Sequence, residues 1–164
     1  MTEAPNYIRD LVIANRILAH EDVLDAYGHI SLRHPDNPER FLLSCSRSPE
    51  LVEPEDIVEH HLNGQPVNPD GRKLYLERFI HGAVFEARPD VVAVVHSHAE
   101  DVLPFSMVPV PLKPVLHNAC KMGSHVPNWD IRDAFGDTNM LVAKIEQGRD
   151  MAKALGNASV VLMR

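Results

Sequence analysis

A helix that runs directly into an apolar strand limits the folds open to this chain. Residues 74–87 carry apolar side chains at helical spacing, and Arg88-Pro89 ends the pattern because proline cannot continue a helix. The apolar run Val91-Val92-Ala93-Val94-Val95 follows at once and is typical of a strand. With a proline turn between them, the strand runs back alongside the helix. Residues at the start of the helix can therefore lie beside the end of the strand.

The apolar run ends in His96-Ser97-His98, a pattern that points to metal chemistry. Side chains alternate between the two faces of a strand, so both imidazoles point the same way and can reach one ion. Imidazole nitrogen suits zinc, iron, nickel and copper, and a carboxylate as third ligand widens the choice toward manganese. Glu77 lies nineteen residues before His96, where the return of the chain can bring it beside the metal. Two packing histidines and a solvated glutamate are the plainer alternative.

Hydrophobic periodicity and turn residues place the other elements. Asn63-Gly64 favours a tight turn, because this dipeptide readily adopts positive φ angles. Five prolines between residues 104 and 127 indicate a long irregular stretch, and loops of this kind often carry function. The remaining expected elements are a helix over 7–19, a hairpin of strands 29–33 and 41–45, a second hairpin of strands 57–62 and 65–67, a helix over 139–155, and a buried strand over 158–163.

Composition restricts the classes of function. The chain has 164 residues, 45% of them hydrophobic, which favours one globular domain over residues 1–164. Its net charge of −7 argues against a nucleic-acid partner, since phosphate binding depends on clustered Lys and Arg. Cys45 and Cys120 form no close pair, which favours a reducing compartment and a cytoplasmic location. No apolar stretch approaches the roughly 18 residues of a membrane span, so we expect no membrane partner.

Four motifs together resemble the class II aldolase/adducin family. Glu77 followed by the string from Ala87 through Arg88-Pro89-Asp90 and the apolar run to His98 is similar to that family's motif in spacing and residue type. Gly28-His29-Ile30-Ser31, Glu55-Asp56-Ile57-Val58 and Pro114-Val115-Leu116-His117 also match, so the resemblance spans nearly the whole chain. It implies a three-layer α/β/α fold with a central, mainly antiparallel β-sheet. It also implies a homotetramer with active sites at subunit boundaries.

The resemblance assigns roles to the metal pattern. His96 and His98 become metal ligands, and Glu77 becomes the catalytic acid/base. The cofactor is expected to be a divalent ion, namely zinc, manganese, iron or cobalt. The family's third histidine ligand follows a strand similar to residues 160–164, so we expect a C-terminal part of the domain to be missing. Possible substitutes are His29, His81, His117, His125 and Cys120, and Glu77 is itself a candidate third ligand.

The substrate pattern departs from that of phosphate-binding members. Their phosphate-binding residues are replaced here by His29, by a loop that begins Ser46-Arg47, and by Tyr75-Leu76, so we expect a substrate without phosphate. Arg47 and His29 could bind a carboxylate instead, although an arginine in a polar loop is often simply solvated. Asn118 replaces a tyrosine that aldolases of the family use as an acid, and His117 is a possible substitute. The expected substrate-binding residues are His29, Ser46, Arg47, His117 and Asn118.

These features favour a metal-dependent carbon–carbon lyase. The expected substrate is a small non-phosphorylated hydroxy acid, cleaved through a metal-stabilised enolate, with decarboxylation favoured over retro-aldol cleavage. An aldolase acting on a sugar or sugar phosphate is one alternative. Two others are a mononuclear iron oxygenase, and a non-catalytic interaction module of the kind found in adducin.

Overall fold

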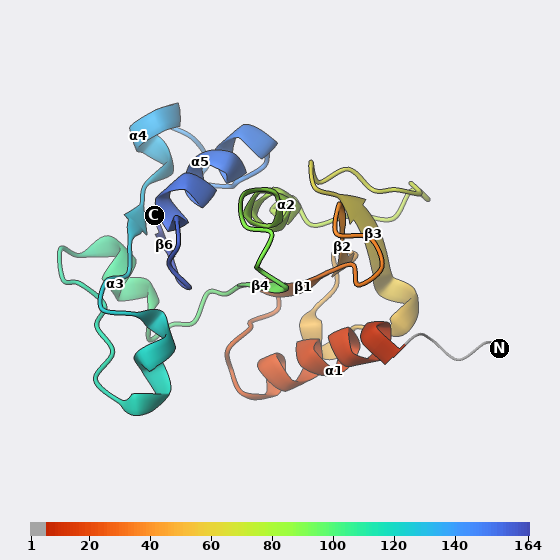
Figure 1. Ribbon diagram of the computed structural model, residues 1–164, viewed down its shortest axis with the longest axis horizontal. Helices are drawn as coiled ribbons and strands as arrows, with labels where there is room; N and C mark the ends of the chain where they lie inside the picture. The colour runs from red at the N-terminus through yellow and green to blue at the C-terminus, as the bar shows by residue number, and fades with distance from the viewer. Residues whose placement is uncertain (1–5) are drawn as a thin grey trace.

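The central element of the fold is a four-stranded antiparallel sheet, seen in a computed structural model that describes residues 6–164 (Figure 1). The strand order is β3-β2-β1-β4, so β4 forms one edge. His29 pairs with His96 across β1 and β4, which places both side chains on the same face. The strands are β1 (His29–Arg33), β2 (Arg40–Ser44), β3 (Ile57–His61) and β4 (Ala93–His96).

Helices cover both faces of this sheet and produce three layers. Helix α1 (Asn6–His20) packs against one face, where Leu11 contacts Ile30 and Leu42 in a buried cluster. Helix α2 (Arg78–Ala87) lies on the other face (Figure 1). There the alternate strand residues Phe41 and Leu43 are buried together with Phe85 and Tyr75. The period-two alternation of the strands therefore supplies one apolar surface to each helical layer.

A second helix, α5 (Ile145–Leu155), packs closely on α2 and builds the largest core cluster. The contact depends on glycine. A Cβ atom at Gly148 would lie 2.4 Å from the carbonyl oxygen of Phe79, and one at Gly82 would lie 2.2 Å from that of Leu62. Both distances are too short for a real contact, so only glycine allows α2 to approach α5 and the β3 hairpin this closely.

The remaining elements are short and lie mostly beyond β4. No helix within residues 6–164 combines the length and the apolar character needed to cross a membrane. Strands β5 (Asn128–Trp129) and β6 (Leu162–Met163) pair in parallel as a separate two-stranded sheet. The other elements are η1 (Pro49–Leu51), η2 (Pro54–Asp56), α3 (Leu103–Met107), η3 (His117–Met122) and α4 (Ile131–Phe135).

The elements predicted with strong periodicity are present, but two helices begin later than expected. Helix α2 begins at Arg78 rather than residue 74, because the preceding segment lies beside the 45–48 loop: the Ser46 amide donates to the Lys73 carbonyl, and the Tyr75 hydroxyl donates to the Arg47 carbonyl. Helix α5 begins at Ile145 rather than residue 139, since Met140 has a left-handed φ of 68° that interrupts a helix.

Two predicted strands are shorter than expected. The predicted turn at Asn63-Gly64 is present, with a φ of 80° at Gly64, but residues 65–67 make only an isolated bridge through Pro66, which has no amide to donate. The prediction of a buried strand over 158–163 is wrong in extent. Only Leu162–Met163 is strand, and residues 158–161 line a cavity instead. The proline-rich stretch predicted as irregular contains α3 and η3.

Candidate metal centre and active site

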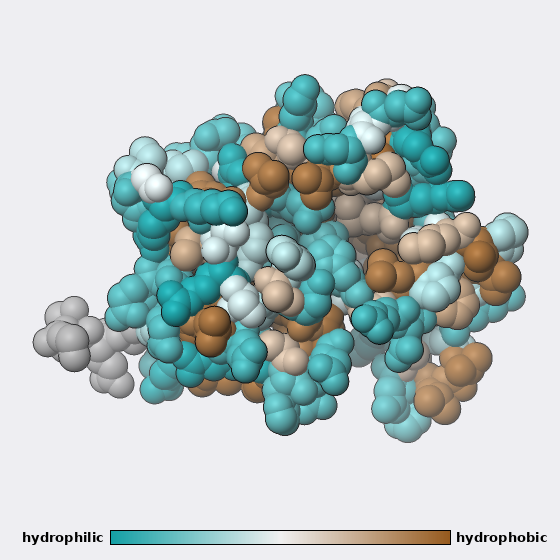
Figure 2. Space-filling view, turned by 180° about the vertical axis from the view of Figure 1, so that it is seen from behind, coloured by the Kyte–Doolittle hydropathy of each residue, from teal (hydrophilic) through white to brown (hydrophobic). Residues whose placement is uncertain are grey.

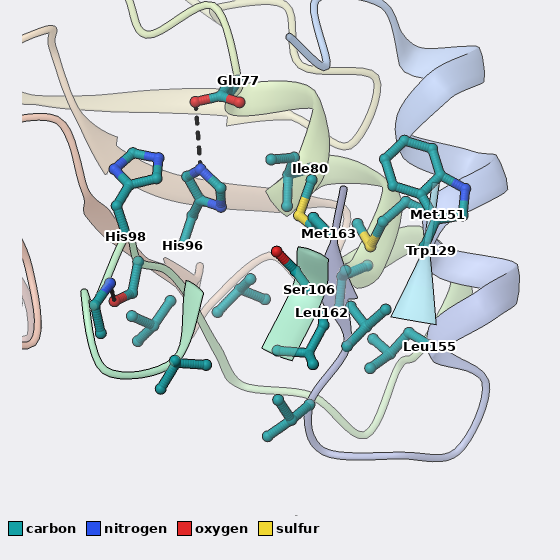
Figure 3. A pocket seen from close by; sticks show the side chains of 18 of the residues that line it. Glu77, Ile80, His96, His98, Ser106, Trp129, Met151, Leu155, Leu162 and Met163 are labelled. Carbon is teal, nitrogen blue, oxygen red and sulfur yellow. Dashed lines mark hydrogen bonds and ion pairs between the residues drawn. The ribbon is translucent and has the colours of Figure 1, made fainter. Parts of the chain in front are cut away.

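Three predicted residues meet at the edge of the central sheet. His96 is the last residue of β4, His98 lies two residues further, and Glu77 is the residue immediately before α2. One ligand atom from each of the three lies within 4.8 Å of the others. Figure 3 shows the Glu77 carboxylate facing the two imidazoles. The predicted helix–turn–strand return therefore brings these side chains together, although Glu77 is the N-cap residue of α2 rather than part of its first turn.

His96 and Glu77 form the more buried half of this group. His96 Nε2 lies 3.3 Å from Glu77 Oε2, and the side chains are only 11% and 16% exposed. Among the described residues, His96 Nε2 is buried and has no hydrogen-bond partner. Burial raises the pKa of Glu77, but the close contact with His96 and the charges of His96 and His98 outweigh it and place that pKa below its ordinary value. Glu77 is therefore a carboxylate at neutral pH.

His98 is oriented by a residue that the sequence did not identify, Asp25. His98 Nδ1 lies 3.1 Å and 3.2 Å from the two carboxylate oxygens of Asp25. The same carboxylate accepts hydrogen bonds from the backbone amides of Tyr27 and Gly28, which hold it in a turn before β1. A carboxylate on one ring nitrogen leaves the other, Nε2, for a metal, as is common at histidine metal sites.

The donor set suits a divalent transition metal. Two imidazole nitrogens and one carboxylate oxygen are a ligand combination used by zinc, iron and manganese. His96 is held by the sheet and His98 by Asp25, whereas Glu77 is the N-cap residue of α2, with no side-chain hydrogen bond to the helix. Glu77 can therefore bind a metal or act on a substrate with little rearrangement of the histidines.

Two cavities meet at Glu77. The larger, of about 1120 Å³, has an apolar lining and lies between β4 and β6 (Figure 3). The smaller, of about 350 Å³, lies between the 45–48 loop and the segment before α2. Glu77, Tyr27 and Leu141 line both. Because the carboxylate stands at the junction, it can reach a ligand that occupies either space.

The smaller cavity contains two of the predicted substrate-binding residues, Ser46 and Arg47. The Arg47 guanidinium is 45% exposed and lies 3.4 Å from Asp56, so part of its hydrogen-bonding capacity is already used. Lys73 adds a second cationic side chain to the lining. Tyr75 closes one wall, and its hydroxyl donates to the Arg47 carbonyl. This cavity therefore offers positive charge beside an aromatic ring.

The other predicted substrate-binding residues lie elsewhere. His29 is fully buried, contacts His81 and lines neither cavity, so it does not present a charged imidazole to a ligand. Burial lowers its pKa well below the ordinary value. His117 and Asn118 are exposed on η3 and also line neither cavity. Within this single chain they do not reach Glu77.

The alternative third ligands are also outside the metal group. His81 is buried and bonded to His29 and Ser31, while His125 and Cys120 are exposed. Sequence reasoning missed Asp25 and Tyr27 because their contacts depend on a turn that folds back on residues far along the chain. The string Asp25-Ala26-Tyr27-Gly28 was a usable signal, since aspartate before a glycine is typical of an Asx turn.

Buried histidines on the α2 face predict sensitivity to acid. Burial, with the charges of His96 and His60, lowers the pKa of His81 to about 3, and burial lowers that of His60 to about 4. Both values lie below the unfolded value of 6.5, so between pH 6.5 and 4 the unfolded chain binds protons at these histidines that the folded chain does not. The free energy of unfolding is therefore highest above pH 6.5 and falls as the pH falls toward 4. Each histidine lowers the free energy of unfolding by roughly 1 kcal/mol for each unit by which the pH falls in this range.

The measurement is urea unfolding at a series of pH values. We expect the free energy of unfolding to fall by at least roughly 2 kcal/mol per pH unit between pH 6 and 4. His60→Gln should reduce that slope by roughly 1 kcal/mol per pH unit. This expectation is independent of the effect of the substitution on the free energy of unfolding at pH 8. An unchanged slope in His60→Gln would show that His60 does not titrate on unfolding.

Comparison with known proteins places this geometry in a family. The model of the class II aldolase and adducin N-terminal domain matches residues 9–164. The chain is 35% identical to the decarboxylase tropJ of Talaromyces stipitatus over 96% of its length, and 28% identical to the 3,4-dihydroxyphthalate decarboxylase of Arthrobacter keyseri over 94%. It covers 64% of each of these relatives.

A solved structure agrees with the fold. An aldolase II superfamily protein from Pseudomonas syringae superposes with a TM-score of 0.78 at 23% identity, and the match covers 100% of this chain and 64% of that protein. The antiparallel sheet with helices on both faces is therefore the class II aldolase-like α/β fold predicted from the motifs. The chain thus spans just under two thirds of these relatives and belongs to the class II aldolase and adducin family.

Proposed function

We propose that this chain forms the catalytic part of a metal-dependent carbon–carbon lyase that decarboxylates a small, non-phosphorylated hydroxy acid. The observation that carries the proposal is the meeting of Glu77, His96 and His98 at the junction of two cavities. The kind of reaction is supported by relatives named as decarboxylases and by membership of a family that includes metal-dependent aldolases. Both reactions break a carbon–carbon bond beside an oxygen-bearing carbon.

The proposed residue roles follow from the chemistry of each group. His96 and His98 hold the divalent ion, zinc, manganese, iron or cobalt, and Glu77 completes the set when no substrate is bound. The ion supplies Lewis-acid stabilisation of negative charge on adjacent oxygens. Glu77, ionised at neutral pH, accepts the substrate hydroxyl proton and returns it to the carbon that loses carbon dioxide. One carbon–carbon bond breaks, one carbon–hydrogen bond forms, and the hydroxyl recovers a proton from water.

The smaller cavity supports an acidic, aromatic substrate. Arg47 and Lys73 supply positive charge for a carboxylate, and Ser46 adds a hydroxyl. Tyr75 and Tyr27 offer aromatic surfaces on which a planar ring can pack. A hydroxylated aromatic dicarboxylate would place one carboxylate among these groups and direct the other toward Glu77. The phosphate of a sugar phosphate would interact with Arg47 and Lys73, but its sugar has no planar ring to pack on Tyr75 and Tyr27.

We further propose that the working form is a cytoplasmic homotetramer in which His117 and Asn118 act on the site of a neighbouring subunit. Both residues are exposed and line neither cavity of their own chain. The preceding segment carries exposed Val110, Val115 and Leu116, and Figure 2 shows hydrophobic side chains gathered at this end of the molecule, away from the grey N-terminal residues. Apolar groups exposed together are typical of a surface that another subunit covers.

A substrate panel tests the proposed function. We expect the metal-loaded protein to release carbon dioxide from 3,4-dihydroxyphthalate and to leave L-fuculose 1-phosphate unchanged. Arg47→Ala should raise KM about tenfold with a smaller effect on kcat, because a charge-assisted hydrogen bond contributes about 1.5–3 kcal/mol. Arg9→Ala, which removes an exposed arginine from α1, is the matched control. Cleavage of the sugar phosphate alone would contradict decarboxylation, and oxygen uptake that tracks substrate loss would instead indicate an oxygenase.

A further inference from the structure

The larger of the two cavities at Glu77 has much more space than a small acid would fill. Its volume of about 1120 Å³ exceeds the roughly 300–1,000 Å³ of pockets that enclose drug-sized ligands. The smaller cavity, of about 350 Å³, lies at the lower end of that range and contains the cationic Arg47 and Lys73. The smaller cavity and the candidate metal centre are therefore sufficient for the acidic head of a hydroxy acid. The larger cavity is available for another part of the same molecule.

The charged side chains in the lining of the larger cavity favour an uncharged occupant. Apart from the candidate metal centre, the only charged residues among those that line it are Arg88 and Arg164. Arg88 pairs with Asp90 at 2.7 Å and donates to the Gly156 carbonyl at 2.7 Å, while Arg164 lies 3.7 Å from Asp130. A charged group placed in this cavity would lose its water and would have to compete with these pairs for a partner. An uncharged group has no such cost.

The rest of the lining is mainly apolar and able to adjust its shape. Figure 3 shows the Glu77 carboxylate and the two imidazoles at one end of the lining, with Trp129, Met151 and Leu155 at the other. The Trp129 indole donates to Asp150 at 2.9 Å, so the one polar atom of this side chain already has a partner. Methionine is unbranched and flexible, which lets it fit irregular apolar shapes. The cavity thus extends from a polar centre to an apolar end.

We propose that the larger cavity binds a hydrocarbon chain carried by the substrate, so that the substrate is an amphipathic hydroxy acid with an alkyl or alkenyl substituent. This inference rests on the function proposed above and adds a substituent to the substrate class named there. The carboxylate and hydroxyl lie at the candidate metal centre and in the smaller cavity, and the chain extends from Glu77 toward Trp129. Each methylene that the cavity removes from water should raise the affinity about fourfold. Preference for the chain therefore depends on the apolar lining.

A series of 2-hydroxy acids tests the proposal without requiring turnover. 2-Hydroxybutanoate and 2-hydroxyoctanoate have the same head and differ only in chain length. In the presence of zinc, we expect calorimetry to show that the octanoate binds at least about 30-fold more tightly. Trp129 is the single tryptophan of the chain and lines the larger cavity, so its fluorescence reports on the apolar end. Its emission should shift to shorter wavelength with the octanoate and stay unchanged with the butanoate.

A charge placed in the lining tests which cavity holds the chain. Val160 is half-buried and lines the larger cavity, and Val160→Asp should weaken binding of 2-hydroxyoctanoate at least about tenfold. Binding of 2-hydroxybutanoate should be unchanged, which also shows that the variant is folded. Val67→Asp is the matched control, because Val67 is a half-buried valine that lines neither cavity. It should leave the affinity for both acids unchanged.

Equal affinities of the two acids for the unaltered protein would overturn the proposal, as would a Trp129 emission that does not respond to the octanoate. A second copy of the chain that covered the cavity would give the same equal affinities and would likewise overturn it. Failure of the decarboxylation assay would refute the proposed reaction but would leave the dependence on chain length intact. Carbon dioxide release together with equal affinities would refute only the chain site, so the two failures are distinguishable.

Discussion

Replacing His96 with alanine is expected to lower the affinity for a divalent metal ion by at least about 100-fold. Loss of an outer partner of a metal ligand typically costs 10–100-fold, and removal of a ligand itself should exceed that range. His96 is the most rigidly held of the three candidate ligands, because it ends a sheet strand and its Nε2 is buried 3.3 Å from Glu77. Its loss would leave two ligands on less constrained segments.

The measurement is competition with a chelator of known affinity, followed by metal analysis of the protein. His61→Ala removes an exposed histidine at the end of β3 and should leave the affinity unchanged. Asp25→Asn should give an intermediate loss of about 10–100-fold, since the amide holds His98 without a full negative charge. Equal metal content in His96→Ala and the unaltered protein would rule out the proposed centre.

Glu77→Gln is expected to lower kcat by about 10²–10⁴-fold while changing KM much less. The amide has the shape of the carboxylate but cannot accept and return a proton, and general acid–base catalysis typically contributes this factor. Because the pKa of Glu77 lies below its ordinary value, the carboxylate form dominates at neutral pH and activity should decline only in acid. The effect should therefore appear across the neutral range.

Carbon dioxide release from 3,4-dihydroxyphthalate under saturating metal measures this change. Glu86→Gln is the matched control, since Glu86 is on the same helix and pairs with Arg149 at the surface, at 2.6 Å. Saturating metal separates the two roles of Glu77, because a variant that had lost only a ligand would recover. Retention of more than about a third of the original rate in Glu77→Gln would exclude Glu77 as the proton-transferring group.

The meeting of Glu77, His96 and His98 was predictable because local rules govern the segment that joins them. A helical stripe ended by Pro89 and followed by an apolar run permits little besides a helix packed back on a strand. The structure has α2 and β4 in these places and brings the three ligand atoms within 4.8 Å. Only the start of α2 differs, because contacts with the 45–48 loop hold the preceding residues out of the helix.

The residues that support the centre were not predictable in the same way. Asp25 reaches His98 across 73 positions, and Ser31 reaches His81 across 50, so neither pair leaves a local pattern. The late start of α5 and the shortened strand before Arg164 have a similar origin, since both segments border the larger cavity rather than a regular neighbouring strand. Contacts between distant segments override local propensity at these positions.

By itself, the sequence determined the order of the elements, the two apolar surfaces of the sheet and the identity of the three candidate ligands. Those properties follow from periodicity, proline and side-chain chemistry, which act within a few residues. Tertiary structure alone decided that Asp25 orients His98, that His29 is buried against His81 rather than exposed to substrate, and that Glu77 lies between two cavities. These depend on the packing of α2 and the loops against the sheet, which places residues from distant parts of the chain within hydrogen-bond distance.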